Sequence, residues 1–362
     1  MIPFLSLVPG EDADDVKQAI SRVVDRGWFV LGPELEAFER EFAARSGAAH
    51  AVGVANGTDA LALALRALGV GAGDEVVTSP LSAAFSALPI MMAGARPVFA
   101  DIDPERLTLD PAAFERAITP RTRAVMPVHL YGQPADMPAI VAIAARHGIT
   151  VVEDCCQAHL ATCAGRPVGS FGAAAAFSFY PTKNLGALGD GGAVTTDDPE
   201  LAHALMKLRN GGQSAKYHHD TFGVNSRLDE IQAAVLTARL RWLPKWTAER
   251  RTLAAAYRDR LSNAAVHVPR EFDSGHVYHL FPVLSGRRAA VQAHLATRGI
   301  ETLVHYPVPL TRQRAFAAQR PSTCPVADRI CAEVFSLPLH PGMTTATIDE
   351  VAAALRASDA AA

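Results

Sequence analysis

Apolar and polar positions alternate along the first two thirds of the chain in a pattern that predicts strands and helices in turn. Short β-branched runs are typical of buried strands, and each precedes a longer segment with helical periodicity. The predicted strands are 50–56, 75–80, 96–103, 122–130, 151–156 and 173–179. The predicted helices are 33–47, 57–74, 82–94, 111–118 and 137–148. This order indicates parallel βαβ units and an α/β fold with a mostly parallel, doubly wound sheet.

The alternating pattern weakens after a predicted helix at 228–243, LDEIQAAVLTARLRWL. A long helix through KWTAERRTLAAAYRDRL, residues 245–261, then leads into a smaller region of mixed character. A chain of 362 residues suits two domains better than one core. We therefore predict a large α/β domain over 1–240 and a smaller α+β domain over 241–362.

Composition narrows the classes of function. Apolar residues make up 49% of the chain and charged residues 20%, as in a globular enzyme. The net charge of −3 gives no reason to expect a nucleic-acid or acidic-membrane partner. No apolar run approaches the roughly 18 residues of a membrane span. The first residues, MIPFLSLVPGEDADD, lack the basic start and apolar core of a signal peptide, so we expect a cytoplasmic protein.

The cysteines and histidines do not form a recognisable metal-binding pattern. The five cysteines are Cys155, Cys156, Cys163, Cys324 and Cys331. Their spacing includes no CxxC pair and matches no common zinc or iron–sulfur motif. His218 and His219 have no suitably spaced third ligand. We therefore expect no metal site, and we expect the thiols to act as small buried apolar groups.

The strongest chemical signal lies between residues 151 and 196. The apolar run VVED ends in Asp154, and 29 residues later Lys183 stands between Ser178 and the glycine-rich run LGALGDGGA. Ligands bind at the carboxyl ends of parallel strands, where both side chains would meet. A lysine for a Schiff base and a carboxylate for the pyridine nitrogen are what pyridoxal 5′-phosphate (PLP) requires. A helix-capping aspartate and a surface lysine are the alternative, which the combination with a strand and glycines disfavours.

The chain resembles the DegT/DnrJ/EryC1/StrS family of PLP-dependent sugar aminotransferases, which have the fold-type I architecture. The resemblance rests on segments in the family's order along nearly the whole chain. They include IPFLSL, GPELEAFEREFA, GVANGTDALALALRALG, GDEVVTSP, GARPVFADID, VVEDCCQAH, GSFGAAAAFSFYPTKNLGALGDGGAV, LRNGGQ, NSRLDEIQAAVL and HYPVPL. NGTDAL together with FSFYPTKNLGALGDGG is far more specific than a single glycine motif. The resemblance implies a homodimer with the active site at the subunit interface.

The resemblance assigns cofactor roles to seven residues. Lys183 matches the Schiff-base lysine, Asp154 the partner of the ring nitrogen, and Gln157 the contact to the ring hydroxyl. The phosphate is expected at Gly57, Thr58, Ser178 and Asn225, the last from the other subunit. The start of a helix at Gly57 suits a phosphate on physical grounds as well. For Asn56–Gly57–Thr58 and for Asn225, an ordinary helix cap remains the alternative.

His305 and Tyr306, in the HYPVP segment, match the family's sugar-facing loop, with a packed turn as the alternative. Three positions depart from the family pattern. The aromatic residue that usually covers the cofactor ring is replaced by Ala83, Leu160 stands for a glycine, and Thr311 stands for a histidine. Because of these departures the resemblance does not identify the substrate, but the expected cofactor chemistry is unaffected.

The activity implied is transfer of an amino group, by resemblance from glutamate, to the ketone of a nucleotide-linked keto-deoxysugar at C3 or C4. The segments NSRLDE and KYHH favour amination at C3 over amination at C4. A cyclitol or other non-nucleotide ketone is an alternative substrate. A sugar dehydratase of the same fold would carry histidine at the position of Lys183, and a non-catalytic regulatory protein would not need Lys183, Asp154 and Thr58.

Overall fold

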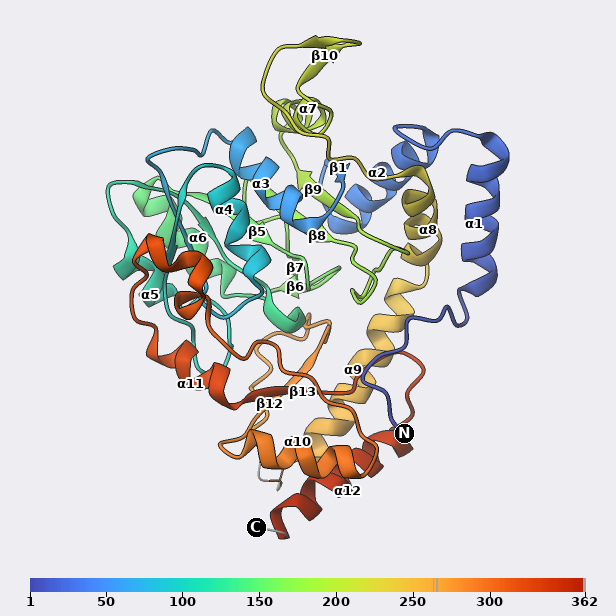
Figure 1. Ribbon diagram of the computed structural model, residues 1–362, viewed down its shortest axis with the longest axis vertical. Coiled ribbons are helices and arrows are strands. Elements are labelled where there is room, and N and C mark those ends of the chain that lie inside the picture. Colours follow the sequence, from blue (N-terminus) through green and yellow to red (C-terminus); the bar gives the residue numbers. More distant parts are fainter. Residues whose placement is uncertain (263, 265, 361–362) are drawn as a thin grey trace.

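A sheet of seven strands forms the centre of the larger part of the molecule (Figure 1). The computed structural model describes residues 1–262, 264 and 266–360. In spatial order the strands are β1 (His50–Val54), β9 (Gly192–Thr196), β8 (Ala174–Ser178), β5 (Thr150–Asp154), β4 (Thr122–Met126), β2 (Glu75–Thr78) and β3 (Arg96–Phe99). The pairs from β8 to β3 are parallel, and β9 runs antiparallel to both neighbours. The expected mostly parallel α/β sheet is confirmed.

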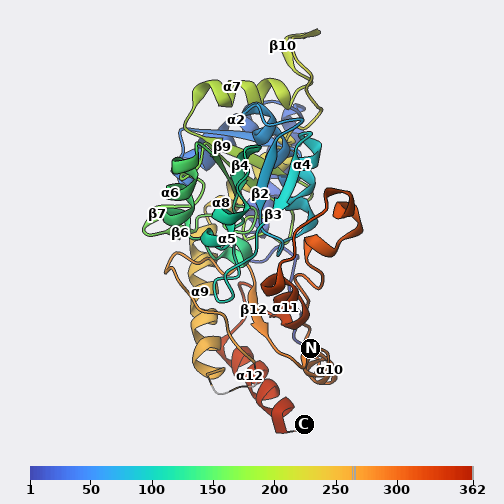
Figure 2. The same cartoon turned by 90° about the vertical axis from the view of Figure 1, so that its left-hand side faces the viewer.

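Helices cover both faces of this sheet, as expected for a doubly wound fold (Figures 1 and 2). On one face lie α3 (Gly57–Ala67), α4 (Leu88–Met92) and α7 (Pro199–Leu208). On the other lie α2 (Pro33–Ser46), α5 (Pro111–Ala117), α6 (Met137–His147) and α8 (Glu230–Leu240). Strand β5 has apolar residues at two consecutive positions because both faces of the sheet are covered: Val151 packs on the side of α2, α5, α6 and α8, and Val152 on the side of α3, α4 and α7.

Several predicted elements have different bounds in the structure. The helix predicted over 57–74 ends at Ala67, before the left-handed Gly69. The helix predicted over 82–94 is a 3₁₀ turn, Ala84–Ser86, followed by α4. Proline is tolerated in the first turn of a helix but not in its interior, so a new helix begins at Leu88, directly before Pro89. Helix α1 (Ala13–Arg26), α7 and β9 were not predicted.

A second hydrophobic core lies in the C-terminal part of the chain and includes Tyr257, Phe281 and Phe335. It is built from α9 (Leu243–Arg260), α10 (Arg288–Thr297), α12 (Thr345–Ala360) and the antiparallel pair β12 (Phe281–Leu284) and β13 (Val334–Leu337). The start of the chain joins this core, because Ile2 pairs with Ile300. The division of the chain near residue 240 stays a prediction.

The remaining elements are short. They are β6 (Thr162–Cys163), β7 (Arg166–Pro167), β10 (Gln213–Ala215), β11 (His218–His219), α11 (Pro325–Glu333) and 3₁₀ turns at Leu130–Gly132, Leu310–Arg312 and Arg314–Gln319. The β10–β11 hairpin projects from the body of the molecule beyond α7 (Figure 1). Within the described residues, no helix combines the length and apolarity needed to cross a membrane.

Candidate active site

Two neighbouring carboxylates, Glu153 and Asp154, end strand β5, and both are buried. Successive side chains of a strand point to opposite faces, so the two carboxylates enter different surroundings. An unpaired buried charge costs several kcal/mol, so each carboxylate must find its own donors. The two sets of donors determine what each residue can do.

Glu153 is fully engaged in fastening a loop to the sheet. One carboxylate oxygen, Oε1, accepts two backbone N–H groups and the other, Oε2, accepts one, at 2.8–2.9 Å, from Phe171, Gly172 and Gly169. Gly172 approaches so closely that a Cβ there would lie 2.5 Å from the carbonyl oxygen of Val151. The Glu153 carboxylate therefore fixes residues 169–172 directly before β8, the strand that leads to Lys183.

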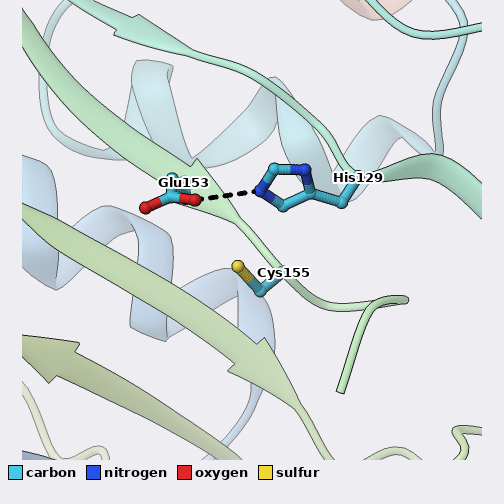
Figure 3. Close-up of side chains that lie close together, drawn as sticks. All are labelled: His129, Glu153 and Cys155. Carbon is cyan, nitrogen blue, oxygen red and sulfur yellow. Dashed lines mark hydrogen bonds and ion pairs between the residues drawn. The ribbon is translucent and has the colours of Figure 1, made fainter. Parts of the chain in front are cut away.

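Figure 3 shows Glu153 beside His129 and Cys155, three buried side chains whose types could in principle hold a metal ion. His129 Nδ1 accepts the backbone N–H of Ala135 at 3.1 Å, so Nε2 carries the ring proton and donates it to Glu153 at 3.1 Å. Burial raises the pKa of the Cys155 thiol, which keeps it protonated. Neither ring nitrogen of His129 is free to bind a metal, and the cluster is a structural network.

Asp154 faces the other side of the strand and has fewer partners. Its Oδ2 accepts the Ser86 hydroxyl at 2.6 Å, and its Oδ1 accepts the backbone N–H of Cys156 at 3.1 Å. A carboxylate can accept about four hydrogen bonds, so Asp154 keeps acceptor capacity for a further donor. This is the difference between Asp154 and its saturated neighbour Glu153.

Lys183 lies in a tight loop that follows β8. Its backbone N–H donates to the Tyr180 carbonyl at 2.8 Å, and a Cβ on Gly186 would lie 2.5 Å from the Pro181 carbonyl oxygen. The Asn184 amide then ties the loop to Val277 O, at 3.0 Å. Loss of hydration lowers the pKa of the Lys183 ammonium, while the nearby Cys156 and Asp154 partly offset that effect. Because β8 pairs with β5 in parallel, the loop after β8 brings Lys183 to the edge of the sheet at which Asp154 stands.

The start of α3 converges on the same site. A Cβ on Gly57 would lie 2.7 Å from Ser178 Cβ and 2.9 Å from Cys156 Sγ, so only glycine fits. The Asn56 side chain caps the helix by accepting the Asp59 N–H at 2.8 Å. Asn56 is therefore the cap, while the helix N-terminus at Gly57 and the Ser178 side chain lie against each other. This cradle suits an anionic group such as a phosphate.

Gln157 has a fixed orientation. Its Oε1 accepts the Tyr131 backbone N–H at 2.7 Å, so its NH₂ group must point the other way. One of the two protons of that group is donated to the Tyr306 hydroxyl at 3.1 Å. The second stays available to a ligand. Burial raises the pKa of Tyr306 to about 12, so the Tyr306 hydroxyl stays protonated and can itself donate.

The other predicted site residues, His305, Thr58 and Asn225, have fewer side-chain contacts that would fix their roles. His305 Nδ1 lies 3.1 Å from Ser336 Oγ, and burial together with Lys183 lowers the His305 pKa to about 4. Thr58 is half-buried, one position after Gly57. Asn225 has an exposed side chain, but the Ser226 hydroxyl donates to Asp59 at 2.6 Å, which places Asn225 beside α3. None of the described contacts assigns a partner to the Asn225 side chain.

The three departures from the family pattern have structural counterparts. Ala83 directly precedes the 3₁₀ turn Ala84–Ser86, and Phe85, the nearest aromatic residue along the chain, is 64% exposed. Leu160 has a φ of 59°, in the left-handed region that favours glycine, which explains why glycine is usual there. Thr311 lies in the 3₁₀ turn Leu310–Arg312.

Two groups of site residues were not expected from the sequence. Ser86 was hidden inside a segment predicted as one helix, and a lone serine carries no local signal. His159 and His279 were not predicted either, although His159 lies in the segment VVEDCCQAH. Both are buried near Lys183, and burial with the lysine charge lowers the pKa of His159 to about 3 and that of His279 well below its ordinary value.

A cavity of about 930 Å³ opens beside Lys183. Its wall includes residues 5–12, residues 340–343 and most of the loop that carries Lys183, residues 181–188, which we call the lysine loop. Arg239 also lines the cavity and connects two of these segments, because it donates to Asp12 Oδ2 at 2.8 Å and to the Gly186 carbonyl at 2.7 Å. The lysine loop is thereby fastened to the beginning of the chain, next to a space large enough for a sizeable ligand.

This fold, with a lysine loop and a strand-end aspartate at one site, defines a fold-type I PLP-dependent aminotransferase. The model of the DegT/DnrJ/EryC1/StrS aminotransferase family matches residues 11–356, and the chain belongs to that family. Its cofactor is PLP, on which the family depends. The resemblance seen in the sequence is confirmed.

Relatives of known name are similar over nearly their whole length. The chain is 50% identical to "dTDP-3-amino-3,4,6-trideoxy-alpha-D-glucose transaminase" of Streptomyces venezuelae, covering 94% of this chain and 91% of that one. It is 45% identical to "UDP-N-acetyl-3-dehydro-alpha-D-glucosamine 3-aminotranferase" of Acidithiobacillus ferrooxidans, covering 95% and 93%. The solved structure of DesV from S. venezuelae matches with a TM-score of 0.96, at 48% identity over 98% of both chains.

The residues present fit PLP. The glycine-lined cradle at Gly57 and Ser178 suits the phosphate, and Asp154 has acceptor capacity left for a protonated ring nitrogen. Gln157 has a free N–H for the ring oxygen, and Lys183 has a pKa lowered toward the neutral amine. These residue types are the ones that a PLP site requires.

The buried His159 predicts a specific pH dependence of folding stability. Its pKa is about 3 in the folded protein and near 6.5 in an unfolded chain, so the unfolded chain binds the extra proton in that interval. Stability is therefore lost as the pH falls below about 6.5. In urea titrations at pH 7, 6 and 5, the wild type should lose about 2 kcal/mol more stability in total than His159→Gln, with the larger share lost between pH 6 and pH 5.

The same substitution at the exposed His147, His147→Gln, is the matched control for replacing a histidine with glutamine. Equal slopes for wild type and His159→Gln would show that His159 takes up its proton in the folded state.

Proposed function

We propose that this aminotransferase moves an amino group from glutamate to the C3 ketone of a nucleotide-linked deoxysugar. The observation that carries the proposal is the convergence of Lys183 and Asp154 on one edge of the sheet in a member of this family. The names of both relatives above specify a nucleotide-linked sugar and nitrogen at C3, and this supports C3 over C4. The dTDP and UDP in those names leave the nucleotide open.

In this proposal Lys183 binds the cofactor and then acts as the base. Bound PLP supplies an electron sink for the negative charge that develops at the α-carbon of the donor. Lys183 Nζ takes the proton from that α-carbon, which requires a neutral amine. The lowered pKa of Lys183 provides the neutral amine at a lower pH than a solvated lysine would. The Asp154 carboxylate holds the ring nitrogen in its protonated form.

Gln157, His305 and Tyr306 position the reactants. Gln157 connects the cofactor side to the substrate side, because its amide group reaches Tyr306 while one N–H remains for the ring oxygen. Tyr306 keeps its own proton and can donate it to an oxygen of the sugar. His305 stays neutral at physiological pH and is bound to Ser336, so it offers a hydrogen bond without adding charge.

The enzyme acts as a homodimer in this proposal, and the exposed surface supports it. Trp28, Phe29 and Leu188 are 53, 48 and 42% exposed. They gather around the start of α8, where the Glu230 N–H donates to Phe29 O and the Leu188 N–H to Gln232 Oε1. An apolar patch next to the lysine loop is typical of a protein interface. The partner would cover it and close the site.

The proposed reaction predicts a defined substrate preference. With PLP and glutamate, the wild type should form 2-oxoglutarate with a dTDP-linked 3-keto-deoxysugar and not with its 4-keto isomer or the sugar without its nucleotide. Lys183→Ala should form none, because the base and the covalent attachment are lost, while Lys207→Ala, a change on α7, should behave like the wild type. Product is measured by coupled assay and mass spectrometry.

Faster amination of the 4-keto isomer would refute the assignment to C3. Amination of a non-nucleotide cyclitol ketone would favour the alternative substrate class, and turnover by Lys183→Ala would refute the role of the lysine.

The shared site can be tested by mixing subunits. We predict that Asn225 reaches the phosphate of the partner's site. Lys183→Ala and Asn225→Ala homodimers are each impaired, but a mixed dimer has one site with both lesions and one with neither. Activity should therefore return to about half of the wild-type value per mixed dimer. The measurement uses differently tagged subunits, purified as the mixed species.

No recovery in a purified mixed dimer would show that Asn225 and Lys183 act within one chain, a possibility consistent with the contact of Ser226 to its own α3.

A further inference from the structure

Asp154 stands at the end of a short chain of buried hydroxyl groups. Ser86 Oγ lies 2.6 Å from Asp154 Oδ2, and Ser82 Oγ lies 2.7 Å from Ser86 Oγ. The three residues are 2–4% exposed. They come from different parts of the fold: between β2 and α4, Ser82 precedes the 3₁₀ turn Ala84–Ser86 and Ser86 ends it, whereas Asp154 ends β5.

The direction of these hydrogen bonds follows from the groups themselves. An ionised carboxylate only accepts, so Ser86 must give its one hydroxyl proton to Asp154. The Ser86 oxygen is then the acceptor for the hydroxyl of Ser82. Both bonds point toward the carboxylate, and each strengthens the other by polarisation. With the Cys156 N–H on Oδ1, both Asp154 oxygens have one donor and keep room for another.

We propose that Ser86 is a positioning residue, supported by Ser82, that fixes the Asp154 carboxylate toward the cofactor's ring nitrogen and keeps the shared proton on that nitrogen. The inference rests on the proposed role of Asp154. Hydrogen bonds to a carboxylate stabilise its charged form, so the carboxylate competes less for the ring proton. A bond of 2.6 Å between a hydroxyl and a carboxylate is in the short, strong range.

Other ionisable groups near Asp154 come from the elements packed around it. Cys156 follows it on the chain, Lys183 comes from the lysine loop, and Tyr306 from the HYPVP segment. Glu153 is on the opposite face of β5 and is saturated by its own donors. A change at Ser86 alters none of these groups directly, so its effect can be read separately from theirs.

The test uses the holoenzyme without sugar substrate. Lysine-bound PLP absorbs in the visible, and its band changes with pH when the nitrogen that joins Lys183 to the cofactor loses its proton. A positive charge on the ring nitrogen favours that loss. If Ser86→Ala weakens the charge, the midpoint should rise by about one pH unit, as expected for one hydrogen bond to a charged group. The rate of reaction with glutamate alone should fall about tenfold, with cofactor content unchanged.

Three further variants make the result specific. Ser86→Thr keeps the hydroxyl and should restore both the midpoint and the rate. Ser82→Ala should shift both in the same direction by less, and it gives a second test if Ser86→Ala does not fold. Ser46→Ala removes a buried hydroxyl of α2 for which the described residues offer no hydrogen-bond partner, and it should leave both values unchanged.

The proposal is overturned if Ser86→Ala or Ser82→Ala, with cofactor bound, titrates and reacts like Ser46→Ala. It is also overturned if Ser86→Thr matches Ser86→Ala, because the effect would then come from packing. A wild type without any visible band would instead refute the cofactor role of Lys183 and, with it, this inference. A wild type with a normal pH-dependent band separates a failure at Ser86 from a failure of the proposed function.

Discussion

The burial of two adjacent carboxylates at the end of β5 is the constraint on which the site depends. A buried carboxylate without donors is costly, and the fold supplies them differently on the two faces of the strand. Glu153 takes three backbone N–H groups and His129, which fixes the entry into β8. Asp154 takes one hydroxyl and one N–H and keeps capacity for a ligand. One carboxylate is thus structural and the other is available for chemistry.

The same strand order brings the other groups to Asp154. Because β8 pairs with β5 in parallel, the loop after β8 delivers Lys183 to the edge where β5 ends. The antiparallel β9 returns beside β8, and its first residue, Gly192, passes so close to Asn56 that a Cβ would lie 2.4 Å from its carbonyl carbon. The cradle at the start of α3 is therefore held by backbone contact, and small residues are required along it.

The parts of the site that follow from local sequence could be predicted. Asp154 and Lys183 stand next to strand-like runs, and the glycine at 57 begins a helix, so their shared location follows from the rule for parallel sheets. Ser86 could not be predicted, because its role depends on a turn where Pro89 interrupts the expected helix and on a contact with a strand 68 residues away. The orientation of Gln157 likewise depends on the Tyr131 backbone. Helix α1 and strand β9 escaped prediction because their positions are set by packing against α8 and β8.

The central claim is that Lys183 alone among the five lysines carries the cofactor. Reduction of the holoenzyme with borohydride makes the lysine–cofactor bond permanent, and peptide mass spectrometry then locates it. The account predicts one phosphopyridoxyl group per chain, on the peptide that contains Lys183. Labelling at Lys17, Lys207, Lys216 or Lys245 instead, or no labelling of a protein that retains PLP, would contradict it.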